Sequence, residues 1–154
     1  MKNYTVKKEN CDDIIVKNIY CIGRNYSEHA KELGNPKPKE PFFFQKSIPS
    51  LNTSQEIILP EDKSIDYEVE IVLLIGRSGT GKSLEDALSF IDGYAIGIDL
   101  TDRAYQNKLK NKKLPWLLSK SFFGSAVVSD FSSKPIEDNF WLNLNGKRKQ
   151  QGSF

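Results

Sequence analysis

Three acidic side chains fall where they could converge on one point. Glu68 and Glu70 alternate along an apolar run at residues 67–76, which predicts a strand with both carboxylates on one face, about 7 Å apart. Asp99 lies between apolar residues at the end of a second predicted strand, where an acid without a partner is unexpected. Three oxygen ligands without His or Cys are typical of a Mg²⁺, Mn²⁺ or Ca²⁺ site. The alternative is a solvent-facing strand whose acids form salt bridges.

The single histidine of the chain is followed by an acid at helical spacing. Residues 27–33 predict one or two helical turns, begun by Ser27 and ended by Gly34. His29 and Glu32 face each other at i and i+3 on such a turn, so the carboxylate can orient the imidazole as a general base. The alternative is an ordinary surface His–Glu pair.

Lys120 lies in the largely apolar segment WLLSKSFFG. A lysine in this setting could be a buried cation that meets an anionic substrate. The alternative is a surface lysine whose aliphatic stem packs on apolar side chains. A run of four lysines precedes it, at positions 108, 110, 112 and 113, and is expected to form a solvated face.

Residues 76–83, GRSGTGKS, fit the phosphate-binding pattern G-x-x-x-x-G-K-[ST] and lie between a predicted strand and a predicted helix. The preceding strand carries Glu68 and Glu70 on one face, whereas the central strand of a nucleotide-binding sheet is apolar on both faces. No further alternation of strands and helices follows to build such a sheet. We therefore expect a Gly- and Ser-rich turn, with a phosphate binder as the remote alternative.

The composition excludes several classes of protein. The 154 residues contain 22 Lys and Arg against 20 Asp and Glu, so the net charge of +2 gives no support to a nucleic-acid partner. No apolar run approaches the roughly 18 residues of a membrane span, and the charged first residues do not resemble a secretory signal. Cys11 and Cys21 are too few for a disulfide framework, so we expect reduced thiols and a cytoplasmic protein.

Most of the predicted elements are strands. Runs rich in β-branched or aromatic residues predict strands at residues 14–22, 42–44, 57–59, 67–76, 94–100, 127–128 and 140–144. Helical spacing of apolar residues predicts an amphipathic helix over residues 83–91, and residues 102–113 form either a polar helix or a long loop. Asn145-Gly146 is typical of a type I′ hairpin turn, so a partner strand should begin at Lys147.

Taken in chain order, these motifs resemble those of the fumarylacetoacetate hydrolase family. Residues 21–32 resemble its G-R-N-Y-x-x-H-x-x-E opening, and residues 41–46 its P-x-x-F-x-K segment. Residues 66–77 resemble its Y-E-x-E-L-x-x-x-I-G-R strand, and residues 93–103 its G-Y-x-x-x-x-D-x-T-x-R segment. Residues 114–122 are similar to L-P-W-x-x-x-K-S-F, as found in the acylpyruvase and oxaloacetate-decarboxylase-like branch.

The resemblance implies a fold and a class of reaction. The fold is mostly β (α+β), the mixed β-sandwich roll of the family, as a single domain over residues 1–154. The implied chemistry is cleavage of a C–C bond beside a 2-oxo acid, by acylpyruvate hydrolysis or oxaloacetate decarboxylation. A hydratase or isomerase reaction on a related 2-oxo acid, and a non-catalytic fragment that binds metal, remain open as alternatives. The expected partners are a small 2-oxo acid substrate and a second copy of the chain, as a homodimer.

The resemblance also assigns roles to the candidate residues. Mg²⁺ or Mn²⁺ would be held by the three acids, and the His–Glu pair would correspond to the family's catalytic dyad on a short lid helix. The implied roles are these: metal ligands Glu68, Glu70 and Asp99; catalytic residues His29, Glu32 and Lys120; substrate-binding residues Arg24 and Gln106.

The chain departs from the family pattern in three places. Ala104 stands where the family usually has Asp, and Gln45-Lys46-Ser47 replaces a usual Leu-Lys-Pro. The family pattern also continues beyond the position of Phe154, through strands that include a T-G-T-P-x-G-V-G loop. We therefore expect the C-terminal strands of the roll to be incomplete in this sequence.

Overall fold

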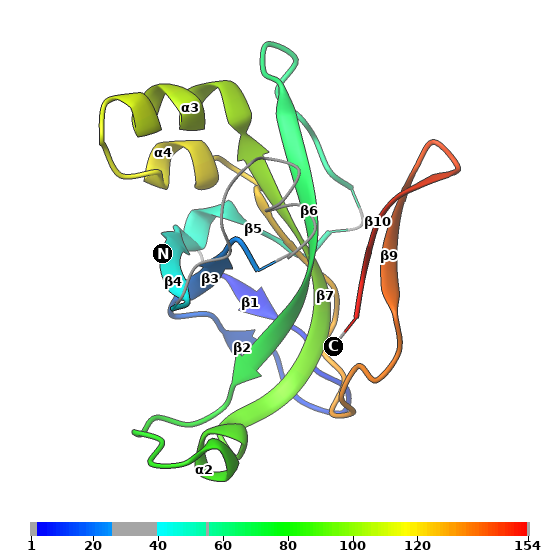
Figure 1. Cartoon of the computed structure of the whole chain (residues 1–154). Coiled ribbons are helices and arrows are strands. Elements are labelled where there is room, and N and C mark those ends of the chain that lie inside the picture. The colour runs from blue at the N-terminus through cyan, green and yellow to red at the C-terminus, as the bar shows by residue number, and fades with distance from the viewer. Residues whose placement is uncertain (1–2, 26–39, 55, 154) are drawn as a thin grey trace.

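The computed structural model describes residues 3–25, 40–54 and 56–153, and a four-stranded sheet forms its centre (Figure 1). The strand order is β5–β8–β7–β6, with β6 (Ile65–Ile75) and β7 (Ile91–Asp102) paired antiparallel along their length. β8 (Ala126–Val128) is antiparallel to β7, and β5 (Leu51–Asn52) is parallel to β8. The sheet is therefore mixed, and the two strands that carry the candidate acids are neighbours.

Three antiparallel strand pairs lie around this sheet (Figure 1). They are β1 (Thr5–Val6) with β2 (Ile14–Ile15), β3 (Ile19–Gly23) with β4 (Phe42–Lys46), and β9 (Phe140–Leu144) with β10 (Lys147–Gly152). A single 3₁₀ turn, η1 (Ile48–Ser50), joins β4 to β5. The φ angles of Asn145 and Gly146 are 52° and 73°, as a type I′ turn requires, so the predicted C-terminal hairpin is confirmed.

Short helices cap the two ends of the β6–β7 pair (Figure 1). α2 (Leu84–Leu88) lies in the connection between the strands, and the Ser83 side chain caps it by accepting from the Asp86 amide. α3 (Arg103–Asn111) follows β7 directly, because the Asp102 side chain accepts from the Tyr105 amide and begins the helix. α4 (Leu117–Lys120) packs against α3 and β7 at the same end.

One face of β6 supplies both the hydrophobic core and the candidate acids. Alternation places Glu68 and Glu70 on the same face as Val72 and Leu74. The latter two pack into the core, whose buried members are Val6, Ala95 and Phe131 and whose half-buried members are Ile14, Val16, Leu51, Val72, Leu74 and Val128. The face is therefore polar toward α3 and α4 and apolar toward α2.

Gly97 on β7 lies opposite Glu70, where this polar face changes to an apolar one. A Cβ atom at Gly97 would lie 2.7 Å from Val72 Cγ2 and 2.8 Å from the Val127 carbonyl oxygen. Glycine at this position therefore allows β6 and β8 to approach β7 closely.

The structure corrects several expectations about elements. The strand predicted over residues 14–22 is divided into β2 and β3, and residues 57–59 do not form a strand. The helix predicted over residues 83–91 is shorter, because β7 already begins at Ile91. Residues 102–113 contain the helix α3 rather than a long loop. The helical turn predicted over residues 27–33 lies outside the described residues.

The GRSGTGKS segment connects two antiparallel neighbours in the sheet, β6 and β7. A nucleotide-binding loop instead precedes a long helix that crosses over to a parallel strand, whereas α2 has only five residues. The connection is thus the predicted turn. None of the helices in the described ranges combines the length and apolar character needed to cross a membrane.

Candidate active site

A pocket lies at the end of the β6–β7 pair that carries α3 and α4. It is bordered by residues of β3, β4, β6, β7 and α3, and by Trp116 and Lys120, the N-cap and the last residue of α4. Six of the eight candidate residues from the sequence line it: Arg24, Glu68, Glu70, Asp99, Gln106 and Lys120. His29 and Glu32 lie outside the described residues, so their place relative to the pocket stays a prediction.

The floor of the pocket is acidic because of the strand register. Glu68 on β6 lies directly opposite Asp99 on β7, where side chains are about 5 Å apart at Cβ. Glu70 is the next residue on the same face of β6. Burial first, and then the negative charges of Glu68 and Asp99, raise the pKa of Glu70 to about 8. The sheet therefore gathers three carboxyl groups that repel one another.

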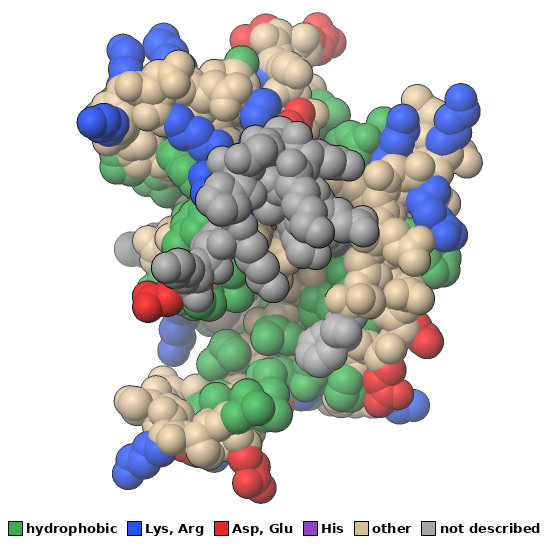
Figure 2. Space-filling model, viewed as in Figure 1, with side chains coloured by type: hydrophobic (Ala, Val, Ile, Leu, Met, Phe, Trp, Pro, Cys, Tyr) green, Lys and Arg blue, Asp and Glu red, His purple; other side chains and the backbone are tan. Residues whose placement is uncertain are grey.

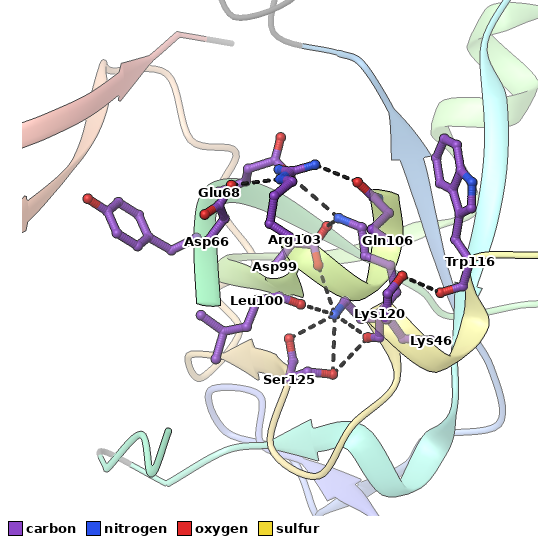
Figure 3. A network of polar contacts seen from close by, with 12 residues as sticks. Lys46, Asp66, Glu68, Asp99, Leu100, Arg103, Gln106, Trp116, Lys120 and Ser125 are labelled. Carbon is purple, nitrogen blue, oxygen red and sulfur yellow. Dashed lines mark hydrogen bonds and ion pairs between the residues drawn. The ribbon is translucent and has the colours of Figure 1, made fainter. Parts of the chain in front are cut away.

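Lys120 partly neutralises this acidic floor (Figure 3). Its ammonium forms an ion pair with Asp99 Oδ2 and lies 3.4 Å from Glu68 Oε2. The residue is only 3% exposed, and the ammonium lies 4.8 Å from the centre of the Phe44 ring. The structure thus makes Lys120 a buried cation and not a surface lysine. Glu68 and Asp99 are salt-bridged, as the alternative expected, but within a pocket.

Lys46 is a second buried cation, which the residue pattern had not singled out. Its ammonium donates to the carbonyl oxygens of Leu100 at 3.0 Å, Ser125 at 2.9 Å, and Lys120 (Figure 3). It also lies 2.8 Å from Asp99 Oδ1, and burial lowers its pKa. Lys46 therefore ties β4 to β7 and to the loop that follows α4. Alternation along β4 could have found it, because Lys46 follows Phe42 and Phe44 on the inner face.

The three acids fit a divalent cation chemically, although they do not already form a metal cluster. Among the described residues, no group of three His, Cys, Asp or Glu side chains is close enough to hold a metal. Asp99 Oδ1 is buried and, within the same residues, accepts no hydrogen bond of good geometry, although Lys46 Nζ is 2.8 Å away. A divalent cation would satisfy that oxygen and remove the repulsion that raises the pKa of Glu70.

The first turn of α3 supplies a polar wall. Arg103 Nε donates to Asp66 Oδ2 at 2.7 Å, and Arg103 Nη1 donates to Gln106 Oε1. Gln106 is buried, with 2% of its surface exposed. Its side-chain oxygen already accepts a hydrogen bond from Arg103 on the same helix. This arrangement fixes the Gln106 amide at the pocket, where its role in binding substrate stays a proposal.

Three aromatic rings form the opposite wall. The Trp116 ring is edge-on to Phe42, with centroids 5.6 Å apart, and tilted against Phe44 at 6.4 Å. A cation from the described residues lies over each ring. Arg24 lies 5.8 Å from the Phe42 centroid, Lys110 lies 4.9 Å from that of Trp116, and Lys120 contacts Phe44. The pocket thus combines an acidic floor with cations around its wall, which suits an anion bound together with a metal cation.

Lys110 differs from the other lysines of its run. Burial, and then the positive charges of Arg103, Arg24 and Lys120, lower the pKa of Lys110. The lysines at positions 108, 112 and 113 are exposed, and Figure 2 shows Lys and Arg side chains gathered over this end of the molecule. Three of the four lysines therefore form the expected solvated face, and Lys110 instead packs on the wall of the pocket.

Comparison with known proteins identifies the family of the chain. Residues 18–154 match the family described as fumarylacetoacetate (FAA) hydrolase, C-terminal. The chain belongs to the fumarylacetoacetate hydrolase family. Its fold is similar to the crystal structure of fumarylpyruvate hydrolase from Pseudomonas aeruginosa in complex with Mn²⁺ and pyruvate, with a TM-score of 0.87 and 29% sequence identity. That similarity covers 97% of this chain and 70% of the other, and confirms the predicted family fold.

Two curated relatives within the fumarylacetoacetate hydrolase family are named as enzymes of oxaloacetate. The mitochondrial oxaloacetate decarboxylase of Dictyostelium discoideum is 39% identical over 145 residues, which is 89% of this chain and 66% of that protein. The oxaloacetate tautomerase YcgM of Escherichia coli (strain K12) is 34% identical over 149 residues, 92% of this chain and 68% of that protein. The chain thus spans about two thirds of the length of these relatives, slightly less in the first case.

Proposed function

We propose that this chain forms a divalent-metal-dependent active site for a small 2-oxo acid, with oxaloacetate as the first substrate to test. The observation that carries the proposal is the gathering of Glu68, Glu70 and Asp99 around the buried ammonium of Lys120 in one pocket. The similarity to an oxaloacetate decarboxylase and an oxaloacetate tautomerase supports this substrate. The similarity to a hydrolase crystallised with Mn²⁺ and pyruvate, itself a 2-oxo acid, supports the class of ligand.

Glu68, Glu70 and Asp99 would hold Mg²⁺ or Mn²⁺. All three are oxygen donors, which these hard cations prefer. Burial, and then the negative charges of Glu68 and Asp99, raise the pKa of Glu70, and a bound cation would relieve the second of these causes. When bound, the metal would act as a Lewis acid on the 2-oxo carboxylate.

The side chains of the pocket would bind the substrate and stabilise the charge that forms on it. In decarboxylation the bond between C3 and C4 of oxaloacetate breaks, CO₂ leaves, and the electron pair passes to the 2-oxo oxygen. In tautomerisation a proton leaves C3 and one is gained at that same oxygen. Lys120 is the buried cation that would donate a hydrogen bond to this oxygen, and Arg24 and Gln106 would contact the carboxylate oxygens.

Hydrolysis of an acylpyruvate is the second candidate, favoured by the similarity to fumarylpyruvate hydrolase. This reaction needs an activated water molecule, whereas decarboxylation does not. His29, oriented by Glu32, would be the general base for that water. His29→Ala should therefore reduce hydrolysis by about 10²- to 10⁴-fold and reduce decarboxylation much less, and equal losses in both reactions would contradict a general-base role.

The function is tested by supplying the purified chain with oxaloacetate in the presence of Mn²⁺ or EDTA. Pyruvate release measures decarboxylation, and the ultraviolet absorbance of the enol measures tautomerisation. Glu70→Gln should remove most of the Mn²⁺ affinity and the metal-dependent turnover, because it deletes a charged ligand. Mn²⁺ binding without turnover on oxaloacetate or acetylpyruvate would favour the non-catalytic alternative, and Mn²⁺ affinity unchanged in the Glu68→Gln, Glu70→Gln double variant would refute the site.

We also expect the chain to form a homodimer. The outer face of the β3–β4 pair exposes Tyr20, Ile22 and Phe43, and exposed apolar patches often mark contact surfaces. Sedimentation equilibrium measures the oligomeric state, and a monomer at all concentrations would contradict this expectation.

A further inference from the structure

The outer edge of β6 is held by a side chain from the C-terminal hairpin. β6 is the last strand in the order β5–β8–β7–β6 of the described sheet, so its peptide groups on one side face away from β7. Gln150 of β10 uses its amide there: Nε2 donates to the Tyr67 carbonyl oxygen at 2.8 Å, and Oε1 accepts from the Val69 amide at 2.9 Å. The Gln150 amide thus takes the place that a peptide group of a neighbouring strand would occupy.

The two peptide groups that Gln150 binds lie on either side of Glu68. Glu68 itself is paired with Asp99 of β7 and lies 3.4 Å from the Lys120 ammonium. The backbone of this one acid is therefore held from both sides, by β7 across the sheet and by Gln150 from beyond its edge.

A bulge in the hairpin aims Gln150 at β6. The β9–β10 register shifts between Arg148 and Gln150, so that Lys149 is an extra residue in the ladder. Such bulges redirect the side chains that follow them. As a result Gln150 is half-buried and β10 contacts β6. The next residue, Gln151, is exposed, and among the described residues its side chain accepts from Arg148 alone, at 3.3 Å.

We propose that Gln150 is a positioning residue for the active site, which acts by fixing the backbone of Glu68. The part of this inference that concerns metal rests on the proposed function, and the part that concerns Glu68 does not. Losing the Gln150 amide would remove its bonds to the Tyr67 carbonyl and to the amide of the buried Val69. The Glu68 segment would then shift or hydrate, and its carboxylate would no longer lie at a fixed distance from Asp99 and Lys120.

The test compares Gln150→Met with Gln151→Met. Both replace an amide by an apolar side chain of similar length on adjacent residues of β10, but only the first breaks the contact with β6. Gln150→Asn is the milder variant, because its amide is one methylene too short to reach both peptide groups and should give an intermediate result. Two readouts are taken on the folded chain: the nuclear Overhauser effect between the Glu68 and Lys120 side chains without metal, and the Kd for Mn²⁺ by calorimetry.

In Gln150→Met we expect the nuclear Overhauser effect between Glu68 and Lys120 to weaken. We also expect the Kd for Mn²⁺ to rise about tenfold, which is the lower end of the range for residues that orient metal ligands. Gln151→Met should change neither. If both readouts are unchanged in Gln150→Met, or if only its melting temperature falls, Gln150 merely attaches the hairpin and the inference is wrong. If the unsubstituted chain does not bind Mn²⁺, the proposed function fails. If Gln150→Met nevertheless weakens the nuclear Overhauser effect between Glu68 and Lys120, the positioning of Glu68 by Gln150 stands.

Discussion

Lys46 and Asp99 form an ion pair inside the protein, with Nζ 2.8 Å from Oδ1. The same ammonium donates to three backbone carbonyls, one of which belongs to Lys120, the other cation that pairs with Asp99. The position of Asp99 and the main chain at Lys120 are thus set by one buried side chain, 3% exposed, on a strand remote in sequence from both.

Lys46→Met should strongly destabilise the fold. It leaves three buried carbonyl groups without their donor and leaves Asp99 with Lys120 as its remaining cation. Removing one partner of a buried ion pair costs about 3–5 kcal/mol. The control is Lys63→Met, which breaks the 3.2 Å pair with Asp102. The Lys63 side chain is one-third exposed and the other Asp102 oxygen keeps its bond from the Tyr105 amide, so this loss should be clearly smaller than that in Lys46→Met. Urea unfolding measures both losses of stability, and equal losses would mean that Lys46 contributes no more than the partly exposed Lys63–Asp102 pair.

The stability of the metal-free chain should fall as the pH rises toward 8. The folded-state pKa of Glu70, about 8, lies above its ordinary value of 4.5. The folded state therefore binds more protons than the unfolded state between these values, and the stability from this group is lost as pH rises through about 8. In Glu70→Gln this part of the pH dependence should be absent. Thermal unfolding with EDTA at pH 5 to 9 measures it, and identical pH profiles for the two proteins would contradict the prediction.

Mn²⁺ binding should release a proton at neutral pH. Glu70 is mostly protonated below pH 8 and must ionise to bind a cation, so we expect the Kd to fall about tenfold per pH unit up to about 8 and then to level off. Calorimetry at pH 7 in two buffers of different ionisation enthalpy gives the number of protons released. A value near zero would show that Glu70 does not ligate the metal or is already ionised.

Lys120→Met should separate metal binding from turnover. The Lys120 ammonium pairs with Asp99 and Glu68, so its removal takes a positive charge away from the acids and should tighten Mn²⁺ binding. Turnover should nevertheless fall, by about 10²- to 10³-fold, the loss typical when a donor to a developing oxyanion is removed. Steady-state kinetics on oxaloacetate and Mn²⁺ titration test the two effects, and a weaker Mn²⁺ affinity with unchanged turnover would reverse the assigned role.

ATP should not bind to the GRSGTGKS segment. The Lys82 amide donates to the Asp86 side chain, and the Ser83 side chain accepts from the Asp86 amide. These two amide groups are therefore already bonded within the turn and α2, and do not point at a phosphate. The unsubstituted chain and Lys82→Ala should give equally flat ATP titrations. Micromolar affinity that Lys82→Ala abolishes would revive the phosphate-binding alternative.

Much of the site follows from local patterns. Alternation along residues 67–76 predicts that Glu68 and Glu70 share a face, and the Asn145-Gly146 pair predicts the final hairpin. Residues 57–59 were wrongly predicted as a strand, because β-branched residues alone do not provide a pairing partner. The contacts of Lys46 with Asp99, and of Gln150 with β6, join residues more than 50 positions apart, so neither could be predicted without the arrangement of the strands.

The glycine opposite Glu70 restricts how this protein can change by mutation. Any side chain at Gly97 would meet Val72 on one side and the Val127 backbone on the other, and the strands would have to separate. Val72 and Glu70 lie on the same face of β6. A larger residue at position 97 that displaces Val72 in the core would therefore also displace Glu70 in the pocket. In a library of random variants, loss of folding and loss of catalysis should therefore coincide along β6 and β7, and neither property could be selected there independently of the other.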